Sequence, residues 1–154
     1  MNSMTRKLAA LFNDYAEYHK TKGNIASHSI GITMITLSIL GLLARVTFGN
    51  PGFYEELFRP DLGLTLIGFS ILYYLYVDWK IALPFFLVLL GLYFIGRAIP
   101  MRGLIGLQVV GWGFQYLGHL YFEKNKPAFY RGLHHPFIGP LWIFSKVVGY
   151  TDEL

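Results

Sequence analysis

Four apolar runs dominate the sequence, at residues 28–48, 62–77, 81–99 and 104–122, with short polar connections between them. A helix needs roughly 20 residues, and at least about 17, to cross the hydrocarbon core of a bilayer. Because no water is available there, each backbone N–H and C=O must be hydrogen bonded within the protein, which favours helices. The runs therefore predict about four transmembrane helices, of which the second is marginal in length.

The predicted fold class is an all-α integral membrane bundle formed by a single domain, residues 1–154. A soluble four-helix bundle is the alternative, but the few charged residues within 62–122 cannot form a solvent-facing stripe. Small residues allow helices to pack closely in a membrane. Glycines lie in or beside the apolar runs at Gly41, Gly63, Gly68, Gly91, Gly96, Gly106, Gly111 and Gly113.

Shorter segments accompany the four runs. Residues 3–22 carry their apolar side chains on one face, which predicts an amphipathic helix at the membrane surface or packed on the rest of the protein. Residues 49–63 predict a short interfacial helix. Residues 137–148 are apolar but too short to cross the bilayer, so they predict a re-entrant or interfacial segment.

The composition excludes several classes of protein and of metal site. Only 14% of the residues are charged and 18% are aromatic, unlike a disordered or nucleic-acid-coating protein. The absence of cysteine excludes disulfides, iron–sulfur clusters and thiolate zinc sites. A metal ion would therefore need nitrogen and oxygen ligands. The first 26 residues lack the apolar core of a cleavable signal peptide.

Basic residues are distributed unequally between the two predicted sides of the membrane. Nine lie on the side of the two termini and the turn at residues 77–80, and four lie on the opposite side. By the positive-inside rule, both termini then face the cytoplasm. We expect the protein in a bacterial inner membrane, or in the endoplasmic reticulum of a eukaryote.

All five histidines fall near that same predicted face. His19 and His28 flank the start of the first run, His119 lies near the end of the fourth, and His134 and His135 follow it. An even number of crossings brings both sets to the cytoplasmic side. Because neutral imidazole binds iron, zinc, copper or nickel, the five histidines predict a metal site.

Two features bear on how those rings would meet. His19 and His28 would converge if the chain turned at Gly23 and Asn24, which interrupt the sequence between them. The `HHP` at residues 134–136 either caps a helix or forms a turn, and either of its rings could complete a metal site.

A polar stripe leads along the fourth run to His119. Gln108, Gln115, His119 and Glu123 recur at spacings of seven, four and four, which places them on one helical face. Polar groups at such depth are expected to face the protein interior. The two glutamines could equally bond neighbouring helices, whereas Glu123 could act as a carboxylate that orients the His119 ring.

The motifs `YHKTKGNIASH` and `QYLGHLYFEKNKPA`, together with the closing apolar `GPLWIF`, resemble a known family. The chain is similar to the small membrane 2-hydroxy fatty acid dioxygenases (Mpo-type, fatty acid α-oxidation), which also occur as uncharacterised bacterial membrane proteins. In fungi this family serves phytosphingosine breakdown in the endoplasmic reticulum. The similarity extends over both ends of the chain and the four-run layout.

The resemblance implies an Fe(II)-dependent α-oxidation. A 2-hydroxy long-chain fatty acid and dioxygen would give the acid one carbon shorter and carbon dioxide. The resemblance further implies His19, His28 and His119 as iron ligands. It marks three motif residues as candidate catalytic residues without an assigned step: Asn24, Gln115 and Glu123. The `HHP` departs from the family pattern, so His134 and His135 are additional candidate ligands of this chain.

Two other functions stay open at this stage. The first is a zinc-dependent membrane lipid hydrolase with Glu123 as general base. The second is a non-catalytic membrane scaffold or small transporter, in which the histidines only join helices. In each case the lipid bilayer is the surrounding medium, nucleic acid is not an expected partner, and the oligomeric state is open, a homo-oligomer included.

Overall fold

The computed structural model describes residues 4–48, 60–124 and 135–150, and every regular element in these ranges is helical, as expected for the all-α class. The expected interfacial helix at 49–63 lies largely outside the described residues, as does His134. The elements are α1 (Arg6–Ala16), α2 (Lys22–Leu43), α3 (Leu62–Ala98), α4 (Met101–Leu117), the π-helical turn η1 (Gly118–Glu123) and α5 (His135–Val148).

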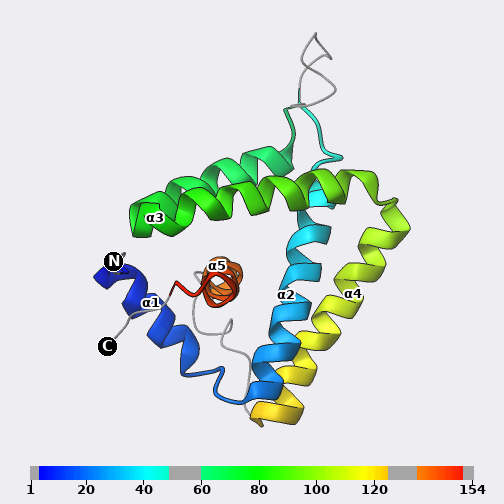
Figure 1. The fold of residues 1–154 in the computed structure, drawn as a ribbon. Helices are drawn as coiled ribbons and strands as arrows, with labels where there is room; N and C mark the ends of the chain where they lie inside the picture. The colour runs from blue at the N-terminus through cyan, green and yellow to red at the C-terminus, as the bar shows by residue number, and fades with distance from the viewer. Residues whose placement is uncertain (1–3, 49–59, 125–134, 151–154) are drawn as a thin grey trace.

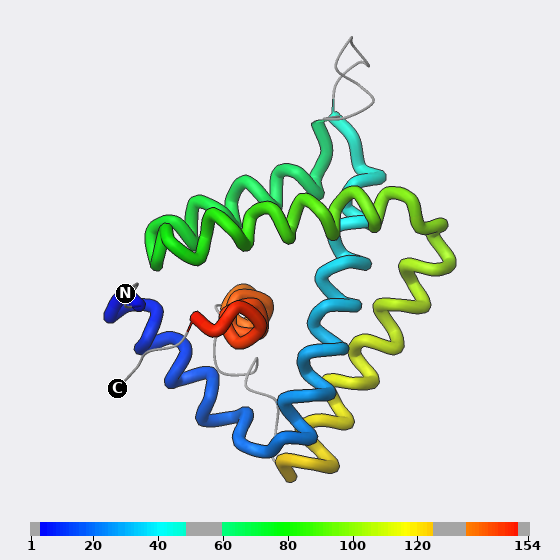
Figure 2. The backbone as a smooth tube through the Cα atoms, in the orientation of Figure 1, coloured from blue at the N-terminus to red at the C-terminus, as the bar shows by residue number. Residues whose placement is uncertain are grey.

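Helix α3 consists of two halves separated by a break at Asp78. This residue has φ −160° and ψ 103°, which is extended rather than helical backbone. The two halves lie side by side in Figures 1 and 2. The turn predicted at residues 77–80 is therefore present, and the second and third apolar runs form the two arms of one hairpin.

The arrangement differs from a bundle in which all four apolar runs lie parallel to one another. Helices α2 and α4 pack side by side, and the two arms of α3 run across their upper ends (Figure 1). Helix α1 slants away from the lower end of α2. Helix α5, seen end-on in Figure 1, occupies the space enclosed by α1, α2 and α3.

Close approaches of α2 to its neighbours occur at pairs of glycines. A Cβ on Gly31 would lie 2.7 Å from the carbonyl oxygen of Gly111 on α4, and a Cβ on Gly41 would lie 2.7 Å from that of Gly96 on α3. Both distances are too short for a side chain, so these positions need glycine. By contrast, a Cβ at several other predicted packing glycines would meet no heavy atom within 4 Å: Gly68, Gly91, Gly106 and Gly113.

Two helix boundaries differ from the predictions made from apolar periodicity. Helix α1 covers residues 6–16 of the expected 3–22 and buries Leu8, Phe12 and Tyr15. Helix α2 begins at Lys22, six residues before the expected start, because the Thr21 hydroxyl accepts a hydrogen bond from the Asn24 N–H and caps the helix. The early start brings Asn24 and His28 onto one continuous helix.

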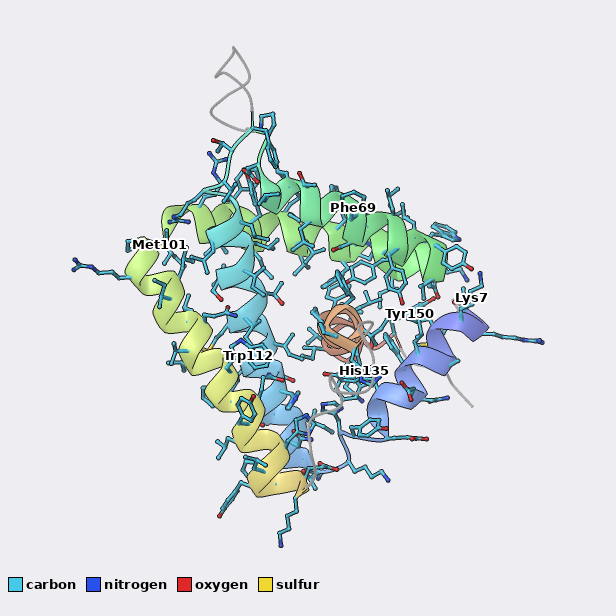
Figure 3. All side chains as sticks on the ribbon, turned by 180° about the vertical axis from the view of Figure 1, so that it is seen from behind. Lys7, Phe69, Met101, Trp112, His135 and Tyr150 are labelled. Carbon is cyan, nitrogen blue, oxygen red and sulfur yellow. The ribbon has the colours of Figure 1, made fainter. Side chains whose placement is uncertain are left out.

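The outer faces of α3 and α4 are apolar. Phe69, Leu87 and Val109 are each at least 67% exposed, and Figure 3 marks Phe69 on α3 and Met101 at the junction with α4. Two helices of the described residues, α2 and α3, are long and apolar enough to cross a membrane. Extended apolar faces of this kind are typical of contact with lipid or with another protein.

The break in α3 also joins the two ends of the described chain. The Asp78 carboxylate accepts hydrogen bonds from the Thr5 backbone N–H at 2.9 Å and from the Tyr150 hydroxyl at 3.0 Å. Figure 3 shows Tyr150 and Lys7 near this end of α3. The N-terminal segment, the turn of α3 and the C-terminal helix thus meet at one place.

Candidate metal centre

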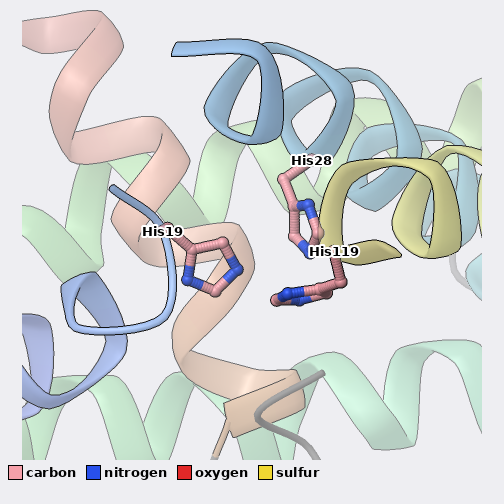
Figure 4. Close-up of side chains that lie close together, drawn as sticks. All are labelled: His19, His28 and His119. Carbon is pink, nitrogen blue, oxygen red and sulfur yellow. The ribbon is translucent and has the colours of Figure 1, made fainter. Parts of the chain in front are cut away.

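Three buried imidazole rings meet where the link between α1 and α2, the helix α2 and η1 come together (Figure 4). The ring centroids are 4.5 Å apart for His19 and His28, 4.5 Å for His28 and His119, and 5.0 Å for His19 and His119. Each ring offers one nitrogen, and these three atoms lie within 4.8 Å of one another. The three histidines could hold a metal ion.

The link between α1 and α2 brings His19 and His28 together. The chain leaves α1 after Ala16 and enters α2 at Lys22, so the turn lies within residues 17–21. Gly23 and Asn24 were expected to form this turn, and that expectation was wrong, because both lie inside α2. Gly23 instead leaves room for Phe122, whose ring would lie 2.3 Å from a Cβ at this position.

A glycine brings η1 against α2. A Cβ on Gly118 would lie 2.4 Å from the Asn24 Oδ1, 2.5 Å from the Ser27 Oγ and 2.8 Å from the His28 Nδ1. Only a residue without a side chain fits so close to three polar atoms. Because His119 follows directly, this contact sets its position beside His28.

The His19 ring is fixed by residues of α1. Its Nδ1 lies 2.7 Å from the Tyr15 carbonyl oxygen, and its ring stacks on the Tyr15 ring with centroids 4.1 Å apart. A carbonyl partner requires Nδ1 to carry the proton, so Nε2 presents a lone pair, and Nε2 is buried without a hydrogen-bond partner. Burial lowers the pKa of His19 to about 4, which keeps the ring neutral at pH 7, the state that a metal ligand needs.

Glu123 joins η1 to the start of α2. Its carboxylate accepts hydrogen bonds from the Lys20 N–H at 3.0 Å, the Thr21 N–H at 3.1 Å, the Thr21 hydroxyl at 2.9 Å and the Asn24 Nδ2 at 3.0 Å. Partial burial raises the pKa of Glu123, but these bonds outweigh burial and lower it to about 2. The geometry therefore favours a role in positioning the two segments over the expected contact with His119, and a carboxylate with so low a pKa is a weak general base at neutral pH.

Asn24 and Gln115, the other two predicted motif residues, are both buried beside the histidines. The Asn24 Nδ2 donates to the Tyr18 carbonyl oxygen at 3.0 Å as well as to Glu123, so this side chain supports the turn at residues 17–21. Gln115 lies one helical turn before His119, and its Nε2 has no hydrogen-bond partner. Gln108 makes the expected bond between helices, accepting from the Ser38 hydroxyl at 2.5 Å.

A cavity of about 390 Å³ opens beside the three rings. Apart from the histidines and Gln115, its lining is mainly aromatic and aliphatic, including Ile32, Ile35 and Trp112. This volume lies within the range of small-molecule sites, roughly 300–1,000 Å³. The combination of a few polar groups at one end and an apolar remainder suits a ligand with a polar head and a hydrocarbon tail.

His135 also borders this cavity but lies outside the group of three rings. Its Nε2 lies 2.9 Å from the Asp14 Oδ2, which links the start of α5 to α1, and Figure 3 marks it at the start of α5. Sequence reasoning missed this contact, and nothing in the spacing of Asp14 and His135 points to it. The stacking of Tyr15 on His19, by contrast, could have been inferred from their separation by four residues on a helix.

Comparison with known proteins bears on this site. Residues 5–151 match the family model described as 2-hydroxy-palmitic acid dioxygenase Mpo1-like. The chain belongs to the Mpo1-like family. The match includes the segments that supply His19, His28 and His119.

A similar protein of the Mpo1-like family is the 2-hydroxy-palmitic acid dioxygenase MPO1 of Saccharomyces cerevisiae, with 32% identity over 117 residues. The aligned region covers 74% of this chain and 63% of the yeast protein, less than two thirds of its length. No solved structure matches the chain.

Proposed function

We propose that this chain is a ferrous-ion-dependent dioxygenase that shortens 2-hydroxy long-chain fatty acids by one carbon. The observation that carries the proposal is the convergence of three buried imidazoles from the two ends of an Mpo1-like chain. The overall reaction balances without a further reductant: R–CH(OH)–COOH and O₂ give R–COOH, CO₂ and H₂O.

His19, His28 and His119 would hold the ion. The fit rests on a neutral nitrogen donor set, which suits iron, and on the buried His19 Nε2, which lacks any hydrogen-bond partner. A bound ferrous ion would supply open positions at which the hydroxy and carboxylate oxygens of the substrate and dioxygen are brought together. His135 binds Asp14, and we assign it to joining α1 and α5 rather than to the ligand set.

The remaining polar residues of the site would bind and position the substrate head. The Gln115 Nε2 is buried, borders the cavity and lacks a partner, so it can donate a hydrogen bond to a substrate oxygen. Asn24 and Glu123 hold the turn that carries His19. The apolar lining excludes water from the reacting end and receives the acyl tail.

The test is anaerobic purification followed by metal analysis and assays with 2-hydroxy and unsubstituted fatty acids. We expect iron in the protein, oxygen uptake with 2-hydroxy acids alone, and one carbon dioxide released for each dioxygen used. Turnover that continues without dioxygen would contradict the proposal and favour a hydrolase.

We further propose that the chain lies in the membrane with four spans, residues 28–48, 62–77, 81–99 and 104–122, and with both termini and the histidines at the cytoplasmic face. Because the chain has no cysteine, single cysteines introduced at the exposed Lys7 and Arg102 form a matched pair for labelling in intact cells. We expect an impermeant thiol reagent to label R102C from outside and K7C only after lysis. The reverse pattern would contradict the orientation.

A further inference from the structure

A second cavity, lined by residues of α2, α3 and α5, adjoins the cavity beside the histidines. The second cavity has a volume of about 150 Å³. Four residues line both cavities: Thr36, Ile39, Pro136 and Pro140. These four residues, called the collar below, lie where the two cavities adjoin.

The two adjoining cavities together form a path, and one face of α2 borders both of them. His28, Ile32, Ile35 and Ile39 line the first cavity, and Leu40 lines the second. The twelve residue-to-residue steps from His28 to Leu40 extend about 18 Å along the helix axis. Two opposed acyl tails fill a hydrocarbon core of about 30 Å, so a single long tail occupies about 15 Å. The path therefore has the length of one long acyl chain.

Residues of α3 line the far end of the two adjoining cavities. Leu66, Ile67, Ser70 and Tyr74 lie at spacings of one, three and four residues on one face of its first arm, and Leu89 comes from the second arm. Ile67, Tyr74 and Leu89 are buried. The Tyr74 hydroxyl donates to the Phe137 carbonyl oxygen at 2.7 Å, which fixes this wall against α5.

The polar groups of the path are concentrated at its histidine end. His19, His28, His119 and Gln115 border the first cavity, while the second contains mainly aliphatic and aromatic side chains. A bound molecule with one polar head would therefore enter in a single direction, with the head at the rings and the tail towards α3.

We propose that the second cavity is the site that measures the length of the acyl tail, with Ser70 and Leu66 as the specificity-determining residues at its end. This inference rests on the proposed function for the identity of the polar head. It adds that the tail passes the Thr36–Pro140 collar and that its last carbons lie against the first arm of α3. Tails too short to pass the collar leave the second cavity unfilled, and tails too long meet Tyr74 and Leu89.

Three variants test the proposal. Ser70→Phe fills the far cavity, Leu66→Ala enlarges it, and Leu72→Phe adds the same aromatic ring on the outer face of the same arm, where Leu72 is 65% exposed. Both turnover and equilibrium binding are measured with fatty acids of graded length. Binding is measured with unsubstituted acids that displace a fluorescent fatty acid from metal-free protein, and turnover with the 2-hydroxy acids.

We expect Ser70→Phe to lower kcat/KM and affinity for the longest acids by about tenfold or more and to leave the shorter acids unaffected, as for a pocket that loses room for a methylene or more. Leu66→Ala should shift the preferred length upwards, and it keeps the test decisive if Ser70→Phe does not fold. Leu72→Phe should match the wild type.

The outcomes separate this inference from the proposed function. Identical length profiles in all variants would overturn the tail site even if every protein oxidised 2-hydroxy acids. A second outcome is that the length preference in binding shifts as expected while none of the proteins oxidises any acid. This outcome would support the tail site and overturn the proposed dioxygenase function.

Discussion

Both ends of α2 contain buried polar groups, but among the described residues only the histidine end leaves several of them without hydrogen-bond partners. Asp61 lies near one end of α2. Its carboxylate accepts hydrogen bonds from the Leu64 N–H at 2.9 Å and from the Tyr93 hydroxyl at 2.5 Å. Arg45 donates to the carbonyl oxygens of Gly41 and Ile99. At this end, the protein itself supplies the hydrogen-bond partners of Asp61 and Arg45.

At the histidine end, several buried side-chain atoms of the described residues have no hydrogen-bond partner: His19 Nε2, Asn24 Oδ1, His28 Nδ1, Gln115 Nε2 and His119 Nδ1. An unsatisfied buried polar group costs about 1–3 kcal/mol. Such a cost concentrated in one place is expected where a ligand completes the bonding. The polar groups at the Asp61 end are therefore satisfied by the protein itself, whereas those at the histidine end could hold a ligand.

The largest expected effect is the loss of metal when a ring is removed. His28→Ala and His119→Ala should each abolish both iron binding and turnover, because two imidazoles remain where the site needs three. Elemental analysis of anaerobically purified protein measures the first and oxygen uptake the second. The control is Gln108→Ala, which lies on α4, the helix that leads into η1 and His119. This variant should retain its iron. Stoichiometric metal in both histidine variants would contradict the assignment of metal binding to the histidine end of α2.

The next largest effect is expected at Gly118. Gly118→Ala forces η1 away from Asn24 and His28, since its Cβ would lie 2.4 Å from the Asn24 Oδ1. We expect iron affinity to fall by about tenfold to a hundredfold, as when a group that orients a ligand is lost. Gly113→Ala is the matched control, because a Cβ there meets no heavy atom within 4 Å. Titration of metal-free protein with Fe(II) under nitrogen gives both constants.

Substitution at the Asp61 end should change stability and leave metal binding intact. Asp61→Ala removes the cap of α3 and leaves the Tyr93 hydroxyl unsatisfied, so we expect a loss of about 2 kcal/mol in the free energy of unfolding. Asp61→Asn, which keeps a capping oxygen, should lose less. Unfolding in detergent is measured beside the iron content of the folded fraction. A loss of iron equal to that in His28→Ala would erase the distinction between the two ends.

The smallest effect concerns acid stability at Glu123. Its pKa is lowered from the usual 4.5 to about 2 in the folded protein, so the folded state binds this proton less readily than the unfolded state. Its contribution to stability is present above about pH 4.5 and is lost as the pH falls towards 2. Glu123→Gln should remove this part of the pH dependence, whereas Glu17→Gln, at an exposed position of the α1–α2 link, should retain it. Thermal unfolding between these two pH values measures the difference.

Local patterns predicted the parts of the fold that depend on short stretches of sequence. The apolar runs located the helices, and the polar `VDWK` located the break at Asp78. The start of α2 was misplaced because apolar periodicity begins at His28, whereas the cap that starts the helix is the polar Thr21. The π-helical turn was not predicted, since it depends on Gly118 meeting α2 across some ninety residues of chain.

The candidate site was predictable in its residues but not in its contacts. The predicted topology placed all five histidines at one face, and the family resemblance selected His19, His28 and His119 among them. The bonds of Glu123 to Lys20 and Thr21, and the contact of His135 with Asp14, depend on how separate segments pack. No spacing rule along one helix could reveal these partners.

X-ray absorption at the iron edge of anaerobically reconstituted protein tests the central claim most directly. We predict a light-atom shell with the multiple-scattering pattern of about three imidazoles, and loss of this signal together with the iron in the His119→Ala variant. An iron shell without imidazole, or an identical spectrum in the triple variant lacking His19, His28 and His119, would contradict the account.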